Sequence, residues 1–526
     1  MGRSPHAVLG YDPAVSDSGV RISDLLVAMS LATDLGFGQP SEHMLRSARI
    51  GMRLGERLGL DTAQMATLYD VGLLTYVGCP TYGNEAAKVF GDDIDFRAHA
   101  LGVDLAGFPA MLFMLRRTGS GRSAVNRALE TATFMATGGR AVLEQMASHC
   151  SAAGALADRL GLGTDVRTGI EQAYARWDGR GVPDTLSGTG LSLAARISHI
   201  AEACEVFERT AGVEAAVNMV RSRSGSHFDP EIAQVAATDP GGLFDGVGEN
   251  TVEEVVAGEP IERANLTDDE LDAALEAIGD FCDLRAPFFA GHARGTASLV
   301  KTAAERLSLP AGEVRLTYRA ALVHDVGRFG VDASVWAHPG PLSAISRERM
   351  RLHVYFVERI FDRPVPLRRI GQLAATHHER LDGSGYHRGV GAAMLSTPAR
   401  LLAAADAYHA MVQPRPYRDA LTEADARERL LADAAQGRLD AQSVDAVLSA
   451  AGHRTGRAPV EGPMGLTPRE NEVLALLAQG LPNKSVAKRL GISAKTVSNH
   501  VERVYAKLGV NNRAAAAMAA MQRGLL

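Results

Sequence analysis

Seven of the histidine and aspartate side chains between Gly291 and Ala410 follow a pattern that could do chemistry. Two adjacent pairs, His-Asp and His-His, alternate with single residues, and each lies on or just after an apolar helical run. Buried imidazole and carboxylate groups need partners, and divalent metal ions are suitable partners. Because no thiolate is among them, the set favours iron, manganese or another first-row divalent ion over a cysteine-based zinc site. The seven residues are His292, His324, Asp325, His353, His377, His378 and Asp406.

The two adjacent pairs predict a centre for two metal ions. One carboxylate can bridge two ions while histidines bind each ion on its outer side, and the pair can hold a hydroxide for in-line attack on phosphorus. The pattern therefore predicts hydrolysis of a phosphodiester or a phosphomonoester. A lone histidine would more simply be a hydrogen-bonded core residue, but the size of this set favours the metal ions.

Helices must position these residues. Apolar residues recur at steps of three and four from Leu45 to Leu58 and again from Leu299 to Leu307, whereas few stretches alternate in the manner of a half-buried strand. The sequence therefore predicts an all-α fold, in which the polar side chains meet inside a helical bundle.

The chain contains a diverged tandem repeat. SEHMLRSARIGMRLGERLGL resembles AGHARGTASLVKTAAERLSL at an offset of 249 residues, which aligns His43 with His292. RWDGRGVP matches RLDGSGYH at an offset of 204, which aligns Asp178 with Asp382. The first copy is therefore longer by 45 residues, and we expect the additional residues to form helices of their own.

The second copy resembles the HD-GYP phosphodiesterases, a branch of the HD hydrolase superfamily. The resemblance rests on HD, HHERLDGSGY and the distal Asp of AAADAYHAM, and it covers roughly residues 283–452. It implies hydrolysis of cyclic di-GMP at a centre of two or three iron ions, with the seven residues as metal ligands and Asp325 as the bridge. It also implies a role for Asp325 and Arg328 in catalysis and phosphate binding, and a substrate loop formed by Asp382, Gly383, Gly385 and Tyr386.

Three positions depart from the family pattern. Arg328 stands where the family usually has Lys, and its planar guanidinium changes the geometry of phosphate binding. His387 replaces the proline of the GYP motif, which leaves the substrate open among cyclic di-GMP, another cyclic dinucleotide and a simple nucleotide. Phe288 replaces a glutamate that some members use as a further ligand, so we expect two divalent ions, Fe or Mn, rather than three.

The first copy lacks most of the metal ligands. It keeps His43 and His149, but Thr75 and Tyr76 replace the His-Asp pair, and Glu202 replaces the distal Asp. The residues Ala173, Tyr174 and Ala175 replace His-His-Glu. Such a set predicts a degenerate domain that cannot hold two ions. Structural pairing with the second copy and a regulatory small-molecule pocket are the two roles that we consider.

The last part of the chain predicts a DNA-binding domain. From Met464 onward the formal charge is +6, against −12 for the rest, and this asymmetry favours an anionic partner. A helix opened by Thr467 and Glu470 is followed by helices over 484–490 and 494–508, in a helix-turn-helix pattern. LTPRENEVLALLAQG, NKSVAKRLGIS and KTVSNHVERVYAKLGV resemble the LuxR-type domain. That resemblance implies dimerisation through 513–521 and contacts with double-stranded DNA from Lys484, Lys495, Thr496, Ser498, Asn499 and Arg503.

The whole sequence predicts two tandem HD-type helical bundles and a helix-turn-helix domain. We place the degenerate copy at 1–265, the second copy at 266–450, a linker at 451–463 and the DNA-binding domain at 464–526. Without a signal peptide or an apolar run of membrane-spanning length, the chain is expected to be cytoplasmic. The separated cysteines Cys79, Cys150, Cys204 and Cys282 are expected to be buried thiols.

The combination of domains favours a homodimeric transcriptional regulator that binds, and hydrolyses, a phosphorylated nucleotide. One alternative is a metal-dependent hydrolase that the DNA-binding tail only localises. The other is a sensor that binds the nucleotide without cleaving it.

Overall fold

The structure is all-α, as the periodicity of the sequence predicts. This computed structural model describes residues 19–81, 83–104, 106–120, 124–137, 140–249, 251–453, 468–478, 481–490 and 492–508, together with Leu466, Val510 and Ala516. Within these residues, extended backbone pairs only as isolated bridges. The contacts divide the chain into a larger unit, Met1–Ala451, and a tail unit, Gly452–Leu526. Both copies of the repeat lie in the larger unit, and the boundary proposed between them at 265 stays a prediction.

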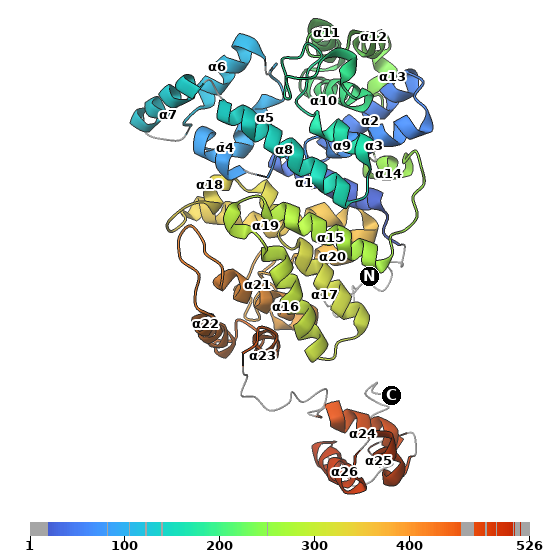
Figure 1. Cartoon of the computed structure of the whole chain (residues 1–526). Helices are drawn as coiled ribbons and strands as arrows, with labels where there is room; N and C mark the ends of the chain where they lie inside the picture. Colours follow the sequence, from blue (N-terminus) through green and yellow to red (C-terminus); the bar gives the residue numbers. More distant parts are fainter. Residues whose placement is uncertain are drawn as a thin grey trace, which may run out of the picture. The chain divides into compact units, whose positions relative to one another are not determined.

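The larger unit is built from two successive series of helices (Figure 1). The first series comprises α1 (Ile22–Gly36), α2 (His43–Arg57), α3 (Thr62–Leu74), α4 (Gly83–Phe90), α5 (Asp93–Ala100), α6 (Gly107–Arg117), α7 (Ala124–Thr137), α8 (Arg140–Arg159), α9 (Thr164–Glu171), α10 (Leu193–Ala211), α11 (Val213–Arg223), α12 (Pro230–Thr238), α13 (Pro240–Phe244) and α14 (Thr251–Ala257), with the 3-10 turn η1 (Gly188–Gly190). The second comprises α15 (Asp268–Asp283), α16 (His292–Arg306), α17 (Ala311–Val323), α18 (Ala333–Trp336), α19 (Ala344–Asp362), α20 (Arg368–Ala374), α21 (Thr397–Met411), α22 (Glu423–Ala435) and α23 (Ala441–Ala450), with the 3-10 turns η2 (Pro287–Phe289), η3 (Val326–Gly330), η4 (Val365–Leu367) and η5 (Ala392–Met394).

The helix boundaries follow the repeat. Helices α2 and α16 have the same length and start at positions that are 249 residues apart, and so do α3 and α17. Helices α8 and α19, like α10 and α21, start 204 residues apart. Even the residue before α2 and α16 has the same left-handed backbone, with φ of 73° at Glu42 and 77° at Gly291. The additional residues of the first copy do form helices, namely α5, α6 and α7.

The two copies pack against each other in a reciprocal way. Helix α1 of the first copy contacts α19 and η3 of the second, and α15 of the second contacts α8 of the first. Because α1 and α15 occupy equivalent places in the repeat, as do α8 and α19, the interface is pseudo-symmetric. One hydrophobic core runs through both copies and includes Leu25 and Leu401.

A buried ion pair crosses the junction between the copies. Arg285, which follows α15, is fully buried and contacts Asp93 at the start of α5 at 2.7 Å. The same guanidinium donates to the carbonyl oxygens of Pro80 and Val331, both at 2.7 Å. Asp93 also accepts from the Ala333 backbone N–H at 2.8 Å. The inserted helix α5 is thereby attached to the segment that follows η3.

The tail unit forms the predicted helix-turn-helix. Its helices are α24 (Pro468–Ala478), α25 (Asn483–Leu490) and α26 (Ala494–Leu508). Val497, Val501 and Val504 of α26 are buried, as the helical spacing predicts. The capping residue Thr467 lies outside the described residues, as does the dimerisation helix predicted over 513–521 except for Ala516.

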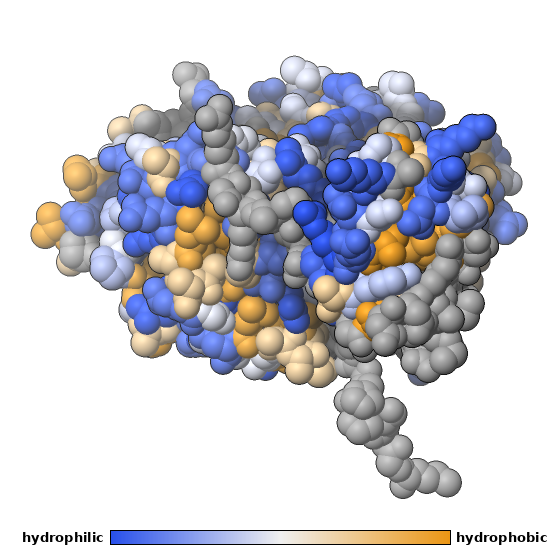
Figure 2. Space-filling view, turned by 90° about the horizontal axis from the view of Figure 1, so that it is seen from below, coloured by the Kyte–Doolittle hydropathy of each residue, from blue (hydrophilic) through white to orange (hydrophobic). Residues whose placement is uncertain are grey.

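The prediction for the four cysteines is confirmed. All four cysteines are buried free thiols. None of the described helices has the length and apolar character needed to cross a bilayer. On the face shown in Figure 2, hydrophilic side chains surround several smaller hydrophobic areas.

Candidate metal centre

The helices of the second copy bring all seven predicted ligands together. His292 is the first residue of α16, the pair His324-Asp325 directly follows α17, and His353 lies within α19. His377 and His378 follow α20, and Asp406 lies within α21. Apolar residues on the same helices hold these side chains in the interior, and all but the half-buried His378 are buried.

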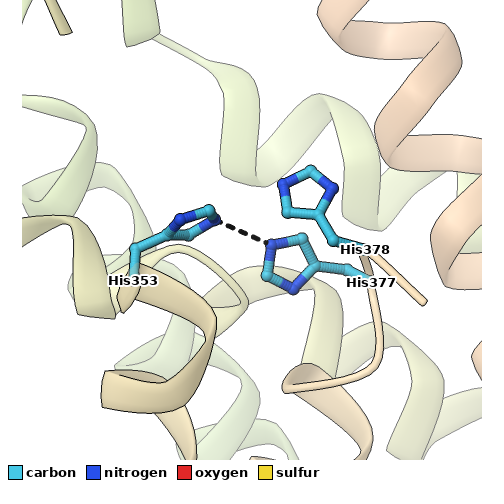
Figure 3. A group of neighbouring side chains, drawn as sticks. All are labelled: His353, His377 and His378. Carbon is cyan, nitrogen blue, oxygen red and sulfur yellow. Dashed lines mark hydrogen bonds between the residues drawn. The ribbon is translucent and has the colours of Figure 1, made fainter. Parts of the chain in front are cut away.

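The ligand atoms form two groups of three. One group is His292, His324 and Asp406, and the other is His353, His377 and His378; within each group the atoms lie within 4.8 Å of one another. Figure 3 shows the second group, in which the three rings point toward one another. The Nε2 atoms of His353 and His377 are 3.3 Å apart.

Asp325 lies between the two groups and presents one oxygen to each. Its Oδ2 is 2.9 Å from Nε2 of His324 and 3.4 Å from Nε2 of His292. Its Oδ1 is 3.6 Å from Nε2 of His353 and 3.8 Å from Nε2 of His377. A carboxylate in this position can contact two cations at once, which is the arrangement of a bridging ligand.

Asp406 also faces both groups. Its Oδ1 is 3.2 Å from Nε2 of His292, and its Oδ2 is 3.6 Å from Nδ1 of His378. The centre therefore has two carboxylates in its middle and imidazoles on two sides.

Backbone carbonyl groups orient three of the imidazole rings. Nδ1–H of His324 donates to Ala321 at 2.7 Å, and Nδ1–H of His377 donates to Ala374 at 2.7 Å. His353 donates in the same way to Met350 at 2.5 Å. Because Nδ1 is the donor in each of these bonds, Nε2 is the atom directed into the centre, as in histidine ligands whose other nitrogen is hydrogen-bonded.

The electrostatics of the centre suit a cation. Burial lowers the pKa of His353 to about 4 and that of His377 to about 3, so both rings are neutral at pH 7. Burial would raise the pKa of Asp325, but Arg328 and His324 hold it well below its usual range. The buried Asp325 Oδ1 has no hydrogen-bond partner in the described part of the chain. The neutral rings of His353 and His377, the ionised Asp325 and its unpaired inward-facing oxygen fit divalent metal ions.

Arg328 lies beside the centre and is positioned by aromatic rings. It forms a salt bridge with Asp325, and its guanidinium carbon lies 3.8 Å from the ring centre of Phe289 and 5.6 Å from that of Trp336. These contacts hold the planar group that, by the family resemblance, is expected to bind phosphate.

Of the predicted substrate loop, Gly385 and Tyr386 lie near the centre, and Asp382 and Gly383 form a turn. The ring of Tyr386 lies 4.7 Å from that of His378. A Cβ atom at Gly385 would lie 2.5 Å from the backbone of His378, so the close approach of the loop requires glycine. Asp382 instead caps its own turn, accepting from the Ser384 backbone N–H at 3.0 Å, and Gly383 has the φ of 76° that this turn requires. His387, at the position of the family proline, contacts Glu358 at 2.8 Å.

Several supporting residues were missed from the sequence. Asp283 accepts from the Ala293 backbone N–H at 3.0 Å and so holds the start of α16. Asp34 makes the same contact with Met44 in the first copy, and the offset of 249 could have revealed both. Gln413 lies 3.1 Å from Nδ1 of His292, and no sequence spacing indicated this contact.

The corresponding part of the first copy contains tyrosine and cysteine side chains and a His-Glu pair. The rings of Tyr76 and Tyr174 are 5.7 Å apart, and the Tyr174 hydroxyl lies 2.7 Å from the Cys79 sulfur. His43 contacts Glu205 at 2.5 Å instead of facing a second imidazole.

The predicted DNA contacts lie on the surface of the tail unit. Lys484, Lys495, Asn499 and Arg503 are exposed, whereas the remaining two are half-buried. The Thr496 backbone N–H donates to the Ser493 hydroxyl at 3.0 Å, and the Ser498 hydroxyl accepts from Asn483 at 3.3 Å. The exposed members are three cations and an amide on one short domain.

Comparison with known families agrees with this organisation. Residues 139–232 and 276–443 match the HD domain, and residues 464–520 match the luxR family of bacterial regulatory proteins. The first match covers part of both copies of the repeat.

Among characterised proteins, the chain resembles cyclic dinucleotide phosphodiesterases. It is 28% identical to 3'3'-cGAMP-specific phosphodiesterase 3 of Vibrio cholerae over 413 residues, which are 78% of this chain and 90% of the relative. It is 37% identical to a cyclic di-GMP phosphodiesterase response regulator of Xanthomonas campestris over 161 residues, 30% of this chain and 40% of that protein. The crystal structure of a cyclic GMP-AMP-specific phosphodiesterase of Vibrio cholerae superposes with a TM-score of 0.57 at 25% identity, covering 83% of this chain and 99% of that one.

Proposed function

We propose that this chain, an HD-domain protein with a C-terminal LuxR-family domain and a homologue of the HD-GYP cyclic dinucleotide phosphodiesterases, hydrolyses a cyclic dinucleotide at a dinuclear metal centre and regulates transcription. The observation that carries the catalytic part is the position of Asp325. One of its oxygens faces His292 and His324, and the other faces His353 and His377.

The residues of the centre have separable roles in this proposal. His292, His324 and Asp406 would hold one divalent ion, and His353, His377 and His378 the other, with Asp325 between them. Bound ions of this kind would supply a hydroxide nucleophile at neutral pH and neutralise charge on phosphate oxygens. Iron or manganese suits the mixed nitrogen and oxygen ligands.

The surrounding residues would bind and orient the substrate. Arg328 offers a guanidinium that lies over the ring of Phe289, next to Asp325, and can donate to a phosphate oxygen. Tyr386 presents an aromatic face beside His378, against which a nucleobase could stack. Two relatives named above act on cyclic dinucleotides, which supports this substrate class over a simple nucleotide.

Metal content and hydrolysis test the catalytic part. Protein purified without oxygen and incubated with Fe(II) and Mn(II) should retain about two ions per chain. Hydrolysis of 3'3'-cGAMP and cyclic di-GMP should fall by at least about 100-fold in Asp325→Asn, because the neutral amide is a poor bridge. Asp362→Asn, which changes an exposed carboxylate at the end of α19, is the matched control.

The outcomes separate the alternatives. Retained metal with nucleotide binding but without turnover in the wild-type protein would support the sensor and refute the enzyme. Failure to retain metal under these conditions would refute the dinuclear centre.

The tail supports the regulatory part of the proposal. Lys484, Lys495 and Arg503 are exposed cations, and Asn499 on α26 has the amide that commonly reads adenine in the major groove. We expect the chain to bind double-stranded DNA as a homodimer, with an affinity that falls as salt rises. DNA binding that persists after deletion from Met464 onward would refute this assignment, and a chain that is monomeric on DNA would refute the dimer.

A further inference from the structure

The first copy contains a cavity in the place that corresponds to the metal centre. At the offsets of the repeat, Tyr76 takes the place of Asp325, and Glu202 takes the place of Asp406. Both residues line this cavity. The first copy therefore has cavity-lining side chains at two positions where the second copy has predicted metal ligands.

The cavity has two adjoining lobes. The polar lobe encloses about 730 Å³ and the apolar lobe about 630 Å³, and each of these volumes includes space open to solvent. The lobes share part of their walls, including Ala100, Leu101 and Tyr174.

The polar lobe is basic. It is lined by Arg176, Arg180 and Arg223. Asp104 and Asp178 form salt bridges with Arg176 and offset two of the three positive charges.

The acid in the polar lobe does not neutralise the remaining positive charge. Glu202 is buried, and burial raises its pKa to about 8, so this carboxyl group is mostly protonated at pH 7. Its Oε1 has no hydrogen-bond partner among the described residues. The net charge of the three arginines and their two aspartate partners is therefore close to +1.

The apolar lobe presents mostly ring and hydrocarbon surface. Phe37, Phe90 and Phe96 line it. Its two basic side chains, Arg97 and His149, offer a polar ligand group little. Arg97 is already bound to Asp93 at 2.7 Å and to the Gly36 carbonyl at 2.9 Å. Burial lowers the pKa of His149 to about 3, so this ring is uncharged at pH 7.

We propose that the first copy binds a small organic monoanion with an apolar body. The anionic group would lie against Arg180 and Arg223 in the polar lobe, and the hydrocarbon or aromatic body would extend past Tyr174 into the apolar lobe. The polar edges of a nucleobase would find few partners among the phenylalanine rings, so the walls favour a carboxylate with an apolar chain over a nucleotide. This site is independent of the metal centre.

Calorimetric titration of the full chain with decanoate tests the assignment. We expect saturable binding, with affinity at least about 10-fold weaker in Arg223→Gln because a charged hydrogen-bond donor is lost. Arg221→Gln on the same helix α11 is the matched control, because Arg221 is exposed and does not line the cavity. Ala100→Phe should abolish binding by filling the wall that the two lobes share.

Other outcomes of these titrations would contradict the proposal. Absence of saturable binding, or equal affinity in wild type and Arg223→Gln, would overturn the proposal. Cyclic di-GMP binding that Ala100→Phe abolishes would replace the apolar anion by a nucleotide and would also refute it. Circular dichroism of each variant establishes that an altered affinity does not arise from unfolding.

Discussion

Replacement of Arg285 by methionine should destabilise the larger unit strongly. Methionine replaces the hydrocarbon part of the arginine side chain but lacks the guanidinium, which contacts Asp93 and the carbonyl oxygens of Pro80 and Val331. Arg285 and Asp93 are both fully buried, so water cannot replace the lost hydrogen bonds.

The expected magnitude follows from this geometry. Removing one partner of a buried ion pair costs about 3 to 5 kcal/mol, because a charge remains in the interior without compensation. Arg97 still contacts Asp93 at 2.7 Å and moderates the charge effect, while the two carbonyl groups lose their donor. We therefore expect Arg285→Met to cost about 3 kcal/mol, a large part of the 5 to 15 kcal/mol by which proteins are usually stable.

Urea unfolding followed by circular dichroism at pH 7 measures this loss. Arg315→Met is the control, because the salt bridge of Arg315 with Asp268 is exposed and such pairs contribute about 0 to 1 kcal/mol. Equal unfolding midpoints for the two variants would refute the reasoning. Burial would raise the pKa of Asp93, but Arg285 and Arg97 lower it below the ordinary value of 3.8, so the stabilisation is present above pH 3.8 and is lost as pH falls further. The difference between wild type and Arg285→Met should therefore shrink in acid.

Three further predictions concern the two sites. Divalent metal should raise the free energy of unfolding by about 2.7 kcal/mol at a free concentration 100 times the Kd, and His324→Ala should remove this effect; an unchanged response in urea unfolding would contradict the ligand assignment. The stability of wild type should fall relative to that of Glu202→Gln as pH rises from 5 to 8. Burial raises the pKa of Glu202 to about 8 in the folded chain, so over this range the carboxyl group ionises in the unfolded chain but stays protonated in the folded one. Parallel pH profiles in urea unfolding would refute this. Gly385→Ala should lower hydrolysis by at least about 10-fold, since its Cβ would meet backbone at 2.5 Å, whereas Gly340→Ala, whose nearest neighbour is at 3.9 Å, should not; equal rates would show that the loop tolerates the shift.

The helices and the residues of the centre could be predicted from the sequence for a physical reason. Apolar spacing marks the buried helix faces, and the repeat supplies a second reading of the same pattern, so α2 and α16 begin at the aligned histidines His43 and His292. Polar residues placed on buried faces must converge, which explains why His324 and Asp406 meet although 82 residues separate them.

The contacts between the copies could not be inferred in this way. Asp93 lies outside the repeat pattern, because α5 belongs to the insertion and has no equivalent in the second copy, so the repeat does not indicate its pairing with Arg285. Nor does a spacing rule show that Asp325 presents one oxygen to each histidine group, or that the replacement of ligands in the first copy leaves a cavity. These features depend on side-chain directions, which hydrophobic periodicity does not encode.

The reciprocal packing of α1 on α19 and of α15 on α8 has a consequence for stoichiometry. An interface in which equivalent surfaces meet is the kind that two identical subunits form around a two-fold axis. Here one polypeptide already satisfies that interface with its own two halves. A chain dimer on a palindromic operator would therefore use other surfaces for association and would bring four HD bundles to the DNA, of which two hold the complete set of histidines and aspartates.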